Sequence, residues 1–301
     1  MNALLIGLGN IGLKYDLHSH KEIYRTHSKS LKKINYFKQI SVVDIKKQNL
    51  KLAKLNYNFK IFEKIKDAIH FSKPEFVIIS TNTNMHLKNL TELIKLHIPK
   101  VILMEKPLSN NLKNVEKIIS ICEKNKIELF TNFIRRSEKS TIDIKKYFLK
   151  GKYYGRVYYN KGFLNNGSHW INLLEYFFGQ VQNFSIIKSI KTKSDKNITV
   201  KLIFKKHQVE LINNLNKKNS NYMILDSNYN QINYLEGGKK IYLLDKIKKK
   251  KIIIKNHMKK YQLKVLNEIV KFIKKKSAFE LCDKHESLNN FETIFKIYSK
   301  K

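Results

Sequence analysis

Short apolar segments alternate with longer amphipathic segments over the first 135 residues. Continuous apolar runs of this length are typical of parallel strands that are covered by helices on both faces. The predicted strands are Ala3–Ile6, Ile40–Asp44, Lys60–Phe62, Phe76–Ser80, Val101–Met104 and Glu128–Asn132. The predicted helices are Ser28–Ile34, Lys46–Leu55, Ile65–His70, Met85–His97 and Asn111–Lys124. The pattern predicts a doubly wound parallel α/β domain over residues 1–135.

The pattern changes near Ser137, where strand-like runs begin to follow one another without helices between them. The predicted strands are Arg156–Tyr159, Phe184–Ile190, Thr199–Phe204, Val209–Asn213, Tyr222–Asp226, Gln231–Leu235 and Lys240–Leu244. The predicted helices are Glu138–Leu149, Ser168–Phe178, Met258–Lys275 and Ser287–Tyr298, and Lys246–Lys251 is expected to be a solvated turn. Residues 136–301 are therefore predicted to form an α+β domain with an open, largely antiparallel sheet.

The net charge of +36 suggests binding of nucleic acid, but the kind of basic residue argues against specific binding. Only four of the 60 basic residues are arginines, and the lysines occur in every segment of the chain. Specific contacts to bases and phosphates favour arginine. Lys, Asn and Ile share A/T-rich codons, so coding bias accounts for this composition. We expect mainly solvated surface and no specific nucleic-acid partner. A functional basic face is the alternative, and the charge should attract anionic small molecules in either case.

The chain shows no feature of a secreted or membrane protein. No apolar stretch approaches the roughly 20 residues that a membrane helix needs, and no signal-like segment precedes the first strand. Cys122 and Cys282 have no metal-type spacing. We expect a reduced, cytoplasmic protein with no membrane partner and no metal.

The first predicted strand runs directly into a glycine motif, Gly7-Leu8-Gly9-Asn10-Ile11-Gly12. Three of the chain's 10 glycines lie here, and the next one is Gly151. This spacing after a strand is the dinucleotide fingerprint: the first glycine makes a tight turn, the second admits the pyrophosphate, and the third permits close helix packing. The motif therefore predicts cofactor binding by Gly7, Gly9, Asn10, Ile11 and Gly12.

Asp44 closes the second predicted strand, where a carboxylate accepts hydrogen bonds from the adenosine ribose and favours NAD over NADP. Lys46 and Lys47 offer charge for a 2′-phosphate, so NADP is not excluded. Asp44 lies 32 positions after Gly12, against an expected distance of about 20. We assign the excess to a polar insertion at Lys14–Arg25.

The insertion contains Asp16, His18 and His20, which are possible metal ligands. Nothing nearby completes a ligand set, so we expect an exposed loop. Because it lies beside the predicted cofactor site, contact with substrate is also possible.

Polar residues follow two further predicted strands at the edge where an open α/β sheet binds its ligand. Ser80, Thr81 and Asn82 suit contacts to cofactor ribose and amide groups. His86 opens the next helix as a cofactor contact or as a simple helix-start residue. Glu105 and Lys106 follow the fifth strand, where a lysine beside the nicotinamide can exchange a proton with a hydroxyl.

The second half contains one chemically suggestive segment, Asn165-Asn166-Gly167-Ser168-His169-Trp170. Ser168 is a predicted N-cap, which places His169 in the first turn of a helix. Histidine acts as acid or base near neutral pH, although a histidine on such a helix, taken alone, is more often structural. Arg135 and Arg136 end the sixth strand as candidates for a substrate phosphate or for an ion pair between the domains.

Three separated motifs together resemble the Gfo/Idh/MocA oxidoreductases: the glycine motif, Glu105-Lys106-Pro107, and Gly167-Ser168-His169-Trp170-Ile171-Asn172. The resemblance covers nearly the whole chain. It implies a Rossmann domain followed by a substrate domain with an open sheet that often forms an oligomer interface. It also implies hydride transfer between NAD(P) and a sugar, inositol or nucleotide-sugar hydroxyl, with Lys106 and His169 as catalytic residues and a cis Lys106–Pro107 bond. By the same resemblance, the first helix resumes at Thr26-His27.

Two positions depart from the family pattern. Many members carry Asp where this chain has Asn165 and Asn172, and an amide cannot accept a proton as a carboxylate does. We therefore expect His169 to act without such a partner, or Lys106 to carry the proton transfer.

The expected substrate contacts are Lys106, Arg136, Asn165, Asn166, Ser168 and His169. The motif around His169 resembles members of surface-polysaccharide and nucleotide-sugar pathways. The alternative is a dinucleotide-binding sensor without turnover.

Overall fold

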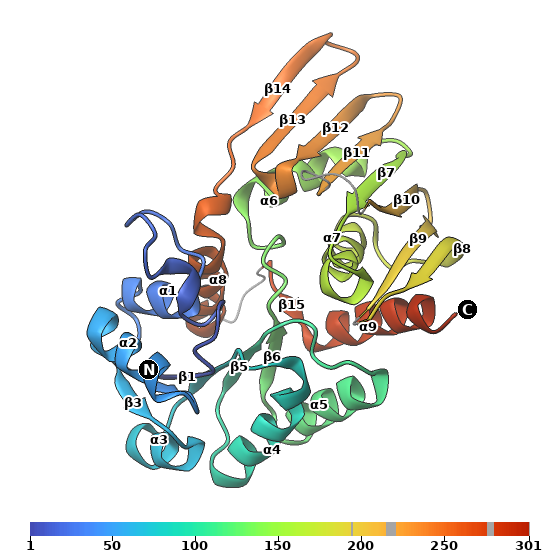
Figure 1. Cartoon of the computed structure of the whole chain (residues 1–301). Helices are drawn as coiled ribbons and strands as arrows, with labels where there is room; N and C mark the ends of the chain where they lie inside the picture. Colours follow the sequence, from blue (N-terminus) through green and yellow to red (C-terminus); the bar gives the residue numbers. More distant parts are fainter. Residues whose placement is uncertain (194, 215–220, 276–279, 301) are drawn as a thin grey trace. The chain divides into compact units, whose positions relative to one another are not determined.

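The computed structural model describes residues 1–193, 195–214, 221–275 and 280–300. It divides into two units, which are described separately (Figure 1). The first comprises Met1–Ser137 and Lys259–Leu288, and the second comprises Glu138–Met258 and Asn289–Lys301. The first unit thus includes a segment of the range 136–301 that the sequence assigned to the second domain. The reason is packing, because this segment supplies a helix and an edge strand to the first unit.

The first unit is built on a sheet with the strand order β15-β6-β5-β4-β1-β2-β3. Six strands are parallel: β1 (Asn2–Ile6), β2 (Gln39–Val43), β3 (Lys60–Phe62), β4 (Phe76–Ile79), β5 (Val101–Met104) and β6 (Glu128–Thr131). The short strand β15 (Cys282–Asp283) joins antiparallel to β6. Chain order reverses at β1, and such a reversal is where open α/β sheets bind ligands. The predicted Rossmann sheet is confirmed.

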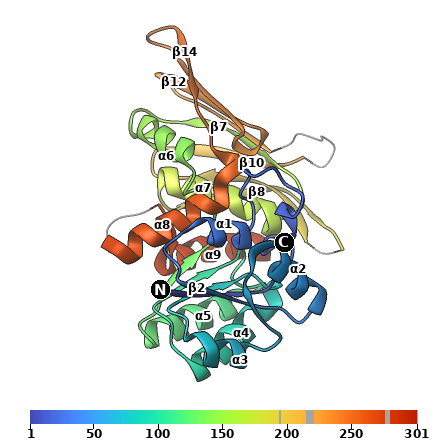
Figure 2. The same ribbon diagram turned by 90° about the vertical axis from the view of Figure 1, so that its left-hand side faces the viewer.

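Helices cover both faces of this sheet (Figure 2). Their bounds are α1 (His27–Lys33), α2 (Lys47–Tyr57), α3 (Ile65–Ser72), α4 (His86–Leu96), α5 (Leu112–Lys124) and α8 (Tyr261–Lys275). One face packs against α1, α2 and α8 in a single apolar core, to which Leu31, Leu50 and Leu266 of the helices and Leu5 of β1 belong. The opposite face carries α3, α4 and α5. Burial on both faces explains why these strands are apolar at nearly every position.

The second unit contains a sheet with the strand order β14-β13-β12-β11-β7-β10-β9-β8. Its strands are β7 (Tyr154–Tyr159), β8 (Asn183–Lys191), β9 (Lys196–Ile203), β10 (Gln208–Asn213), β11 (Tyr222–Asp226), β12 (Asn230–Leu235), β13 (Lys240–Asp245) and β14 (Lys250–Ile254). Neighbours are antiparallel except β7 and β10, which confirms the predicted open, largely antiparallel sheet. β14 was not predicted, because its lysines resemble a solvated turn.

Helix α7 (Ser168–Phe178) covers one face of this sheet. Trp170 packs edge-on against Tyr234 at 5.7 Å between ring centroids, and Phe178 packs edge-on against Phe204 at 5.3 Å. The predicted helix Glu138–Leu149 forms as α6 (Lys139–Lys145) with a 3-10 turn (Lys146–Leu149), and α9 (Lys284–Ser299) ends the chain. None of the helices among the described residues is both long and apolar enough to cross a bilayer.

Candidate active site

The glycine motif forms a tight loop at the carboxyl end of β1. Gly7 has φ +99°, and a Cβ there would lie 2.8 Å from the backbone of Ser80 and Thr81. A Cβ on Gly12 would lie 2.3 Å from the carbonyl oxygen of Gly7. At Gly9, by contrast, an added Cβ would meet nothing within 4 Å. Gly7 and Gly12 are thus required by the fold, whereas Gly9 leaves open space where the fingerprint places a pyrophosphate.

The helix after this loop is interrupted by an insertion. The backbone N–H of His27 donates to Ile11 O and that of Ser28 to Gly12 O, both at 3.0 Å. These pairs are 16 positions apart instead of the 4 of an α-helix, so twelve residues are looped out of one hydrogen-bond ladder. The structure thus shows an insertion of the length that the delayed position of Asp44 indicated.

Asp16 holds the insertion closed. Its Oδ2 accepts hydrogen bonds from the backbone N–H groups of Arg25 and Thr26, each at 2.7 Å, and from Thr26 Oγ1 at 2.9 Å. Arg25 Nε donates to Oδ1 at 3.2 Å. Asp16 is 3% exposed, so the expectation of an exposed loop is wrong for this residue, although His18 and His20 are exposed. Its carboxylate stabilises the loop.

Replacing Asp16 by alanine is expected to destabilise the first unit by about 2–4 kcal/mol, because buried N–H groups lose their acceptor. Asp16→Asn should cost less, since its oxygen still accepts. Urea unfolding of the two variants beside His18→Ala, a change in an exposed side chain of the same loop, measures this. Equal stability of Asp16→Ala and His18→Ala would contradict the role.

Asp44 lies directly after β2 beside the glycine loop. Leu8 N–H donates to its Oδ2 at 2.6 Å, and Lys46 N–H donates to its Oδ1 at 2.8 Å. These bonds hold the carboxylate at the carboxyl edge of the sheet, where adenosine ribose binds in this fold. Lys47 lies 3.6 Å from Glu63, an exposed ion pair.

Ser80, Thr81 and Asn82 follow β4, and His86 begins α4. Ser80 Oγ donates to Gly7 O at 2.8 Å, which joins this turn to the glycine loop. His86 is 1% exposed, with Nε2 3.0 Å from Thr81 O and Nδ1 3.2 Å from Leu108 O. Both ring nitrogens therefore contact backbone of the loops after β4 and β5. These contacts support a structural role in which His86 holds the two loops together. A direct contact of His86 with the cofactor stays a prediction.

Burial lowers the pKa of His86 despite its carbonyl neighbours, because the imidazolium loses hydration. The unfolded chain then binds the proton at a higher pH than the folded chain. The free energy of unfolding should therefore fall as pH decreases below about 6.5. His86→Gln should reduce this slope by up to about 1.4 kcal/mol per pH unit. Urea titrations between pH 7 and 5.5 test it, and an unchanged slope would count against it.

Glu105 and Lys106 follow β5 at the same edge, and the Lys106–Pro107 bond is cis, as the resemblance implied. Glu105 Oε1 lies 2.8 Å from His27 Nε2 and accepts from Asn132 Nδ2 at 2.5 Å. Burial raises the pKa of Glu105, but the hydrogen bonds from His27 and Asn132 and the charge of Lys106 outweigh it and leave the pKa below its usual value. Glu105 is therefore a carboxylate next to Lys106 in sequence.

Arg136 is engaged within the first unit. Its Nη2 contacts both carboxylate oxygens of Glu286 at 2.8 Å, and the residue is 5% exposed. Arg136 thus forms an ion pair inside one unit and not the expected pair between the domains, and a contact with a substrate phosphate stays a prediction.

In the second unit, the candidate residues lie at the start of α7. Ser168 is not its N-cap: a π-helical turn (Phe163–Gly167) precedes it, and Ser168 Oγ donates to Leu164 O at 2.6 Å. The backbone N–H groups at the start of this turn instead donate to Asp195. Its Oδ2 accepts from Leu164 N at 3.1 Å and from Asn165 N at 3.3 Å. Gly162 has φ +83°, and a Cβ there would lie 2.2 Å from the Asp195 carboxylate.

Asn166 belongs to a cluster of amides beside this turn. Its Nδ2 donates to Asn221 Oδ1 at 2.8 Å and Asn160 Oδ1 at 3.2 Å, and Asn221 Nδ2 donates to Asn160 Oδ1 at 3.1 Å. Asn165 is exposed and His169 half-buried. Asn166 thus belongs to a neutral, hydrogen-bonding cluster, and the substrate contacts expected of Asn165, Asn166, Ser168 and His169 stay predictions.

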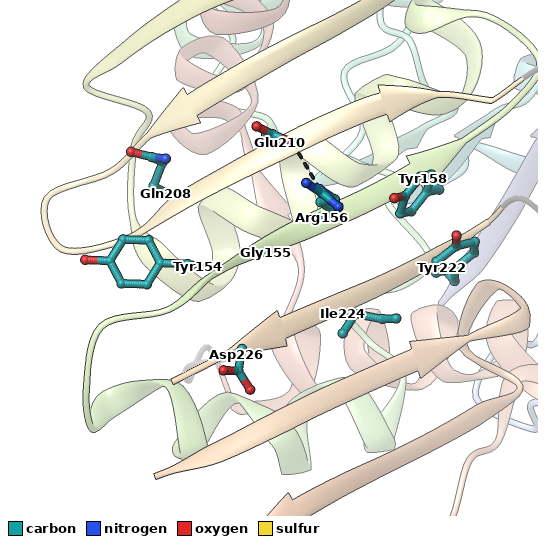
Figure 3. Close-up of a pocket in the computed structure, with 9 residues that line it drawn as sticks. All are labelled: Tyr154, Gly155, Arg156, Tyr158, Gln208, Glu210, Tyr222, Ile224 and Asp226. Carbon is teal, nitrogen blue, oxygen red and sulfur yellow. Dashed lines mark hydrogen bonds and ion pairs between the residues drawn. The ribbon is translucent and has the colours of Figure 1, made fainter. Parts of the chain in front are cut away.

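A hollow of about 470 Å³ lies on the sheet of the second unit (Figure 3). Its lining includes Tyr154, Arg156 and Tyr158 from β7 and Tyr222 from β11. Arg156 Nε pairs with Glu210 at 3.2 Å, and the rings of Tyr158 and Tyr222 stack at 4.5 Å. No predicted site residue lines this hollow.

Sequence reasoning missed several contacts of these candidates, among them His27, Asn132, Asp195 and Gln262. Only His27 had a sequence signal, as the point where the first helix resumes. Within the described ranges, no group of three or more His, Cys, Asp or Glu side chains is placed to hold a metal ion.

Comparisons with known proteins agree with this geometry. A family model described as an oxidoreductase family with an NAD-binding Rossmann fold, Gfo/Idh/MocA, matches residues 1–133. Myo-inositol 2-dehydrogenase of Thermotoga maritima is 27% identical over 147 residues, which are 48% of this chain and 40% of that enzyme. The match thus spans well under two thirds of that relative.

Two solved structures share the fold over almost the whole chain. UDP-N-acetylglucosamine 3-dehydrogenase GnnA from Acidithiobacillus ferrooxidans has a TM-score of 0.79 at 9% identity, covering 99% of this chain and 96% of its own. The WlbA dehydrogenase from Chromobacterium violaceum, in complex with NADH and UDP-GlcNAcA, has a TM-score of 0.75 at 15% identity, covering 99% and 92%. Residues 1–133 thus match the model of the Gfo/Idh/MocA oxidoreductase family and its NAD-binding Rossmann fold, the family that the motifs resemble.

Proposed function

We propose that this protein transfers a hydride between a nicotinamide dinucleotide and a hydroxyl or keto group of a sugar or nucleotide sugar. One observation carries the proposal: the glycine loop, Asp44 and the Glu105-Lys106 pair share the carboxyl edge of a single parallel sheet. The named activities of the relatives give the substrate class. A place in surface-polysaccharide synthesis is part of the same proposal.

The residues at this edge fit the cofactor. The space beside Gly9 is open, so a pyrophosphate could approach the backbone there and accept hydrogen bonds from N–H groups of the loop. The hydrogen bond from Leu8 N–H fixes the Asp44 carboxylate, which could accept hydrogen bonds from a ribose diol. The bound dinucleotide would supply the hydride acceptor or donor. The fixed carboxylate of Asp44 disfavours a 2′-phosphate, so we propose NAD as the preferred form.

In this mechanism Lys106 binds the reacting hydroxyl and exchanges its proton. It takes the proton when the substrate carbon is oxidised and returns it in reduction. His169 is proposed as a second substrate contact that acts without a carboxylate at positions 165 and 172. Asn165, Asn166 and Ser168 are proposed to bind other hydroxyl or amide groups.

The test is a turnover assay at 340 nm with purified protein, NAD(H), and a panel of free and nucleotide sugars. NADH fluorescence measures binding in parallel. Turnover that is lost in Lys106→Ala and His169→Ala while NADH still binds supports the proposal. NADH binding without turnover on the whole panel favours the sensor, and no dinucleotide binding contradicts both.

We also propose that the protein forms a homo-oligomer through the sheet face that bears the hollow. This face presents Tyr154, which is 52% exposed, together with the positively charged Arg156 and the negatively charged Glu210. A surface that carries both signs of charge and an exposed aromatic ring can pair with a second copy of itself. Light scattering coupled to size-exclusion chromatography tests it. An oligomer that dissociates in Tyr154→Glu is expected. The control is Tyr229→Glu, which changes an exposed tyrosine in the turn between β11 and β12 that does not line the hollow, and this variant should keep the oligomer. A wild-type monomer at micromolar concentration would refute it.

A further inference from the structure

Three buried polar side chains and the partly buried Glu105 form hydrogen bonds beneath the loop that carries Lys106. We call them the Glu105 network: His27 at the start of α1, Glu105 after β5, Asn132 after β6 and Gln262 in α8. His27 and Gln262 are fully buried and Asn132 is 1% exposed. In addition to the bonds to Glu105, Gln262 Nε2 lies 2.9 Å from His27 Nδ1, and Asn132 Nδ2 lies 3.1 Å from Gln262 Oε1. The four side chains thus close a ring.

The donors and acceptors of this ring fix the protonation of His27. Glu105 is a carboxylate and can only accept, so the amide nitrogen of Asn132 must face it. The same nitrogen donates to Gln262 Oε1, which leaves Gln262 Nε2 to donate to His27 Nδ1. Nδ1 then carries no proton, and Nε2–H donates to Glu105. His27 is accordingly neutral, with its proton on Nε2.

We propose that His27 and Gln262 are positioning residues that act on Lys106 through Glu105. The inference rests on the proposed function, in which Lys106 exchanges the proton. Glu105 is anchored at two points, by its N–H to Ile79 O at 2.9 Å and by its carboxylate to His27 and Asn132. An adjacent carboxylate also favours the ammonium form of a lysine. The network therefore sets both the place and the protonation of Lys106.

Other titratable groups face Glu105. The charge of Glu105 raises the pKa of both His86 and Tyr261. The charges of Asp16 and Arg25 also act on the pKa of Tyr261. His86 is buried and neutral at pH 7, because burial lowers its pKa. Burial, followed by the charges of Glu105 and Asp16, raises the pKa of Tyr261 far above its usual range, so this phenol stays protonated. The positive charge of Lys106, in turn, lowers the pKa of Glu105.

The insertion contributes to this arrangement through α8. Tyr24 N–H donates to Lys259 O at 2.8 Å, and Gln262 N–H donates to Tyr24 O at 3.2 Å. Asp16 holds the base of the same loop. The looped-out residues therefore anchor the start of α8, where Gln262 enters the network.

The kinetic test compares Glu105→Gln, His27→Gln, His27→Ala and Gln262→Ala with the exposed control His18→Gln, using pH profiles of kcat and KM. We expect His27→Ala and Gln262→Ala to lower kcat by about 10- to 100-fold, with NADH affinity within about threefold. His27→Gln keeps a neutral donor and should recover most of kcat. In Glu105→Gln, the limb of the profile that reports loss of the lysine proton should move to lower pH.

Loss of stability without these kinetic effects, or His27→Gln as impaired as His27→Ala, would overturn the proposal. A second measurement does not depend on turnover. In ¹⁵N-histidine-labelled protein, the His27 signals, assigned by their absence in His27→Gln, should show a neutral Nε2–H ring from pH 6 to 8. If the wild type turns over no substrate, the proposed function fails while this readout still tests the network. An imidazolium or an Nδ1–H ring would overturn it.

Discussion

Lys106→Ala is expected to lower kcat by about 10²- to 10⁴-fold, the usual contribution of a general acid or base. The residue follows β5 at the carboxyl edge of the sheet, the same edge at which the glycine loop follows β1. Because the proposed role is proton exchange, the loss should fall on the chemical step. Affinity for NADH should stay within about threefold, and stopped-flow or steady-state assays at 340 nm measure the difference.

Two controls sharpen this experiment. Lys106→Arg keeps the positive charge but does not release its proton near neutral pH, so it should be nearly as inactive as the alanine variant. Lys100→Ala removes an exposed lysine that pairs with Glu75 just before the same strand, and it should leave turnover unchanged. Wild-type turnover by Lys106→Arg would show that charge alone suffices and would contradict proton exchange.

The parts of the fold that the sequence predicted are those governed by local burial. Both faces of the first sheet are covered, so β1, β4 and β5 appear as unbroken apolar runs whose position could be predicted closely. The insertion was also predictable, because it displaces Asp44 along the chain without changing the strands. The hydrogen bond from His27 N to Ile11 O shows why: the helix resumes in its ladder as though the loop were absent.

The parts that were not predictable depend on partners far away in sequence. Gln262 lies 235 positions from His27, and a glutamine on an amphipathic helix gives no sign of a buried partner. Asp195 meets the amides of Leu164 and Asn165 only because the hairpin of β8 and β9 brings it there. The buried state of Asp16 was missed because its amide donors, Arg25 and Thr26, come at the other end of the insertion.

The same reasoning explains the domain boundary. A helix such as α8 shows where it begins and ends in the sequence, but its amphipathic pattern does not say which sheet it covers. Here Val265 and Ile269 join the core of the first unit, and Cys282 extends its sheet. Sequence order placed this segment with the second domain, whereas apolar contacts place it with the first.

The glycine motif permits a test in which the fold and the cofactor site respond differently. Gly9→Ala should leave the free energy of unfolding within about 1 kcal/mol of wild type, since the new methyl group enters open space. It should nevertheless weaken NADH binding by 10-fold or more, because the pyrophosphate must approach this backbone closely.

Gly12→Ala, in contrast, should mainly lower the free energy of unfolding. Its methyl group would lie 2.3 Å from Gly7 O, so the helix must move from the strand, at an expected cost of about 3 kcal/mol or more. Urea unfolding and NADH fluorescence titration of both variants separate the effects. If Gly9→Ala bound NADH as wild type does, the space beside Gly9 would not be the pyrophosphate site, and the cofactor assignment of the whole loop would have to be revised.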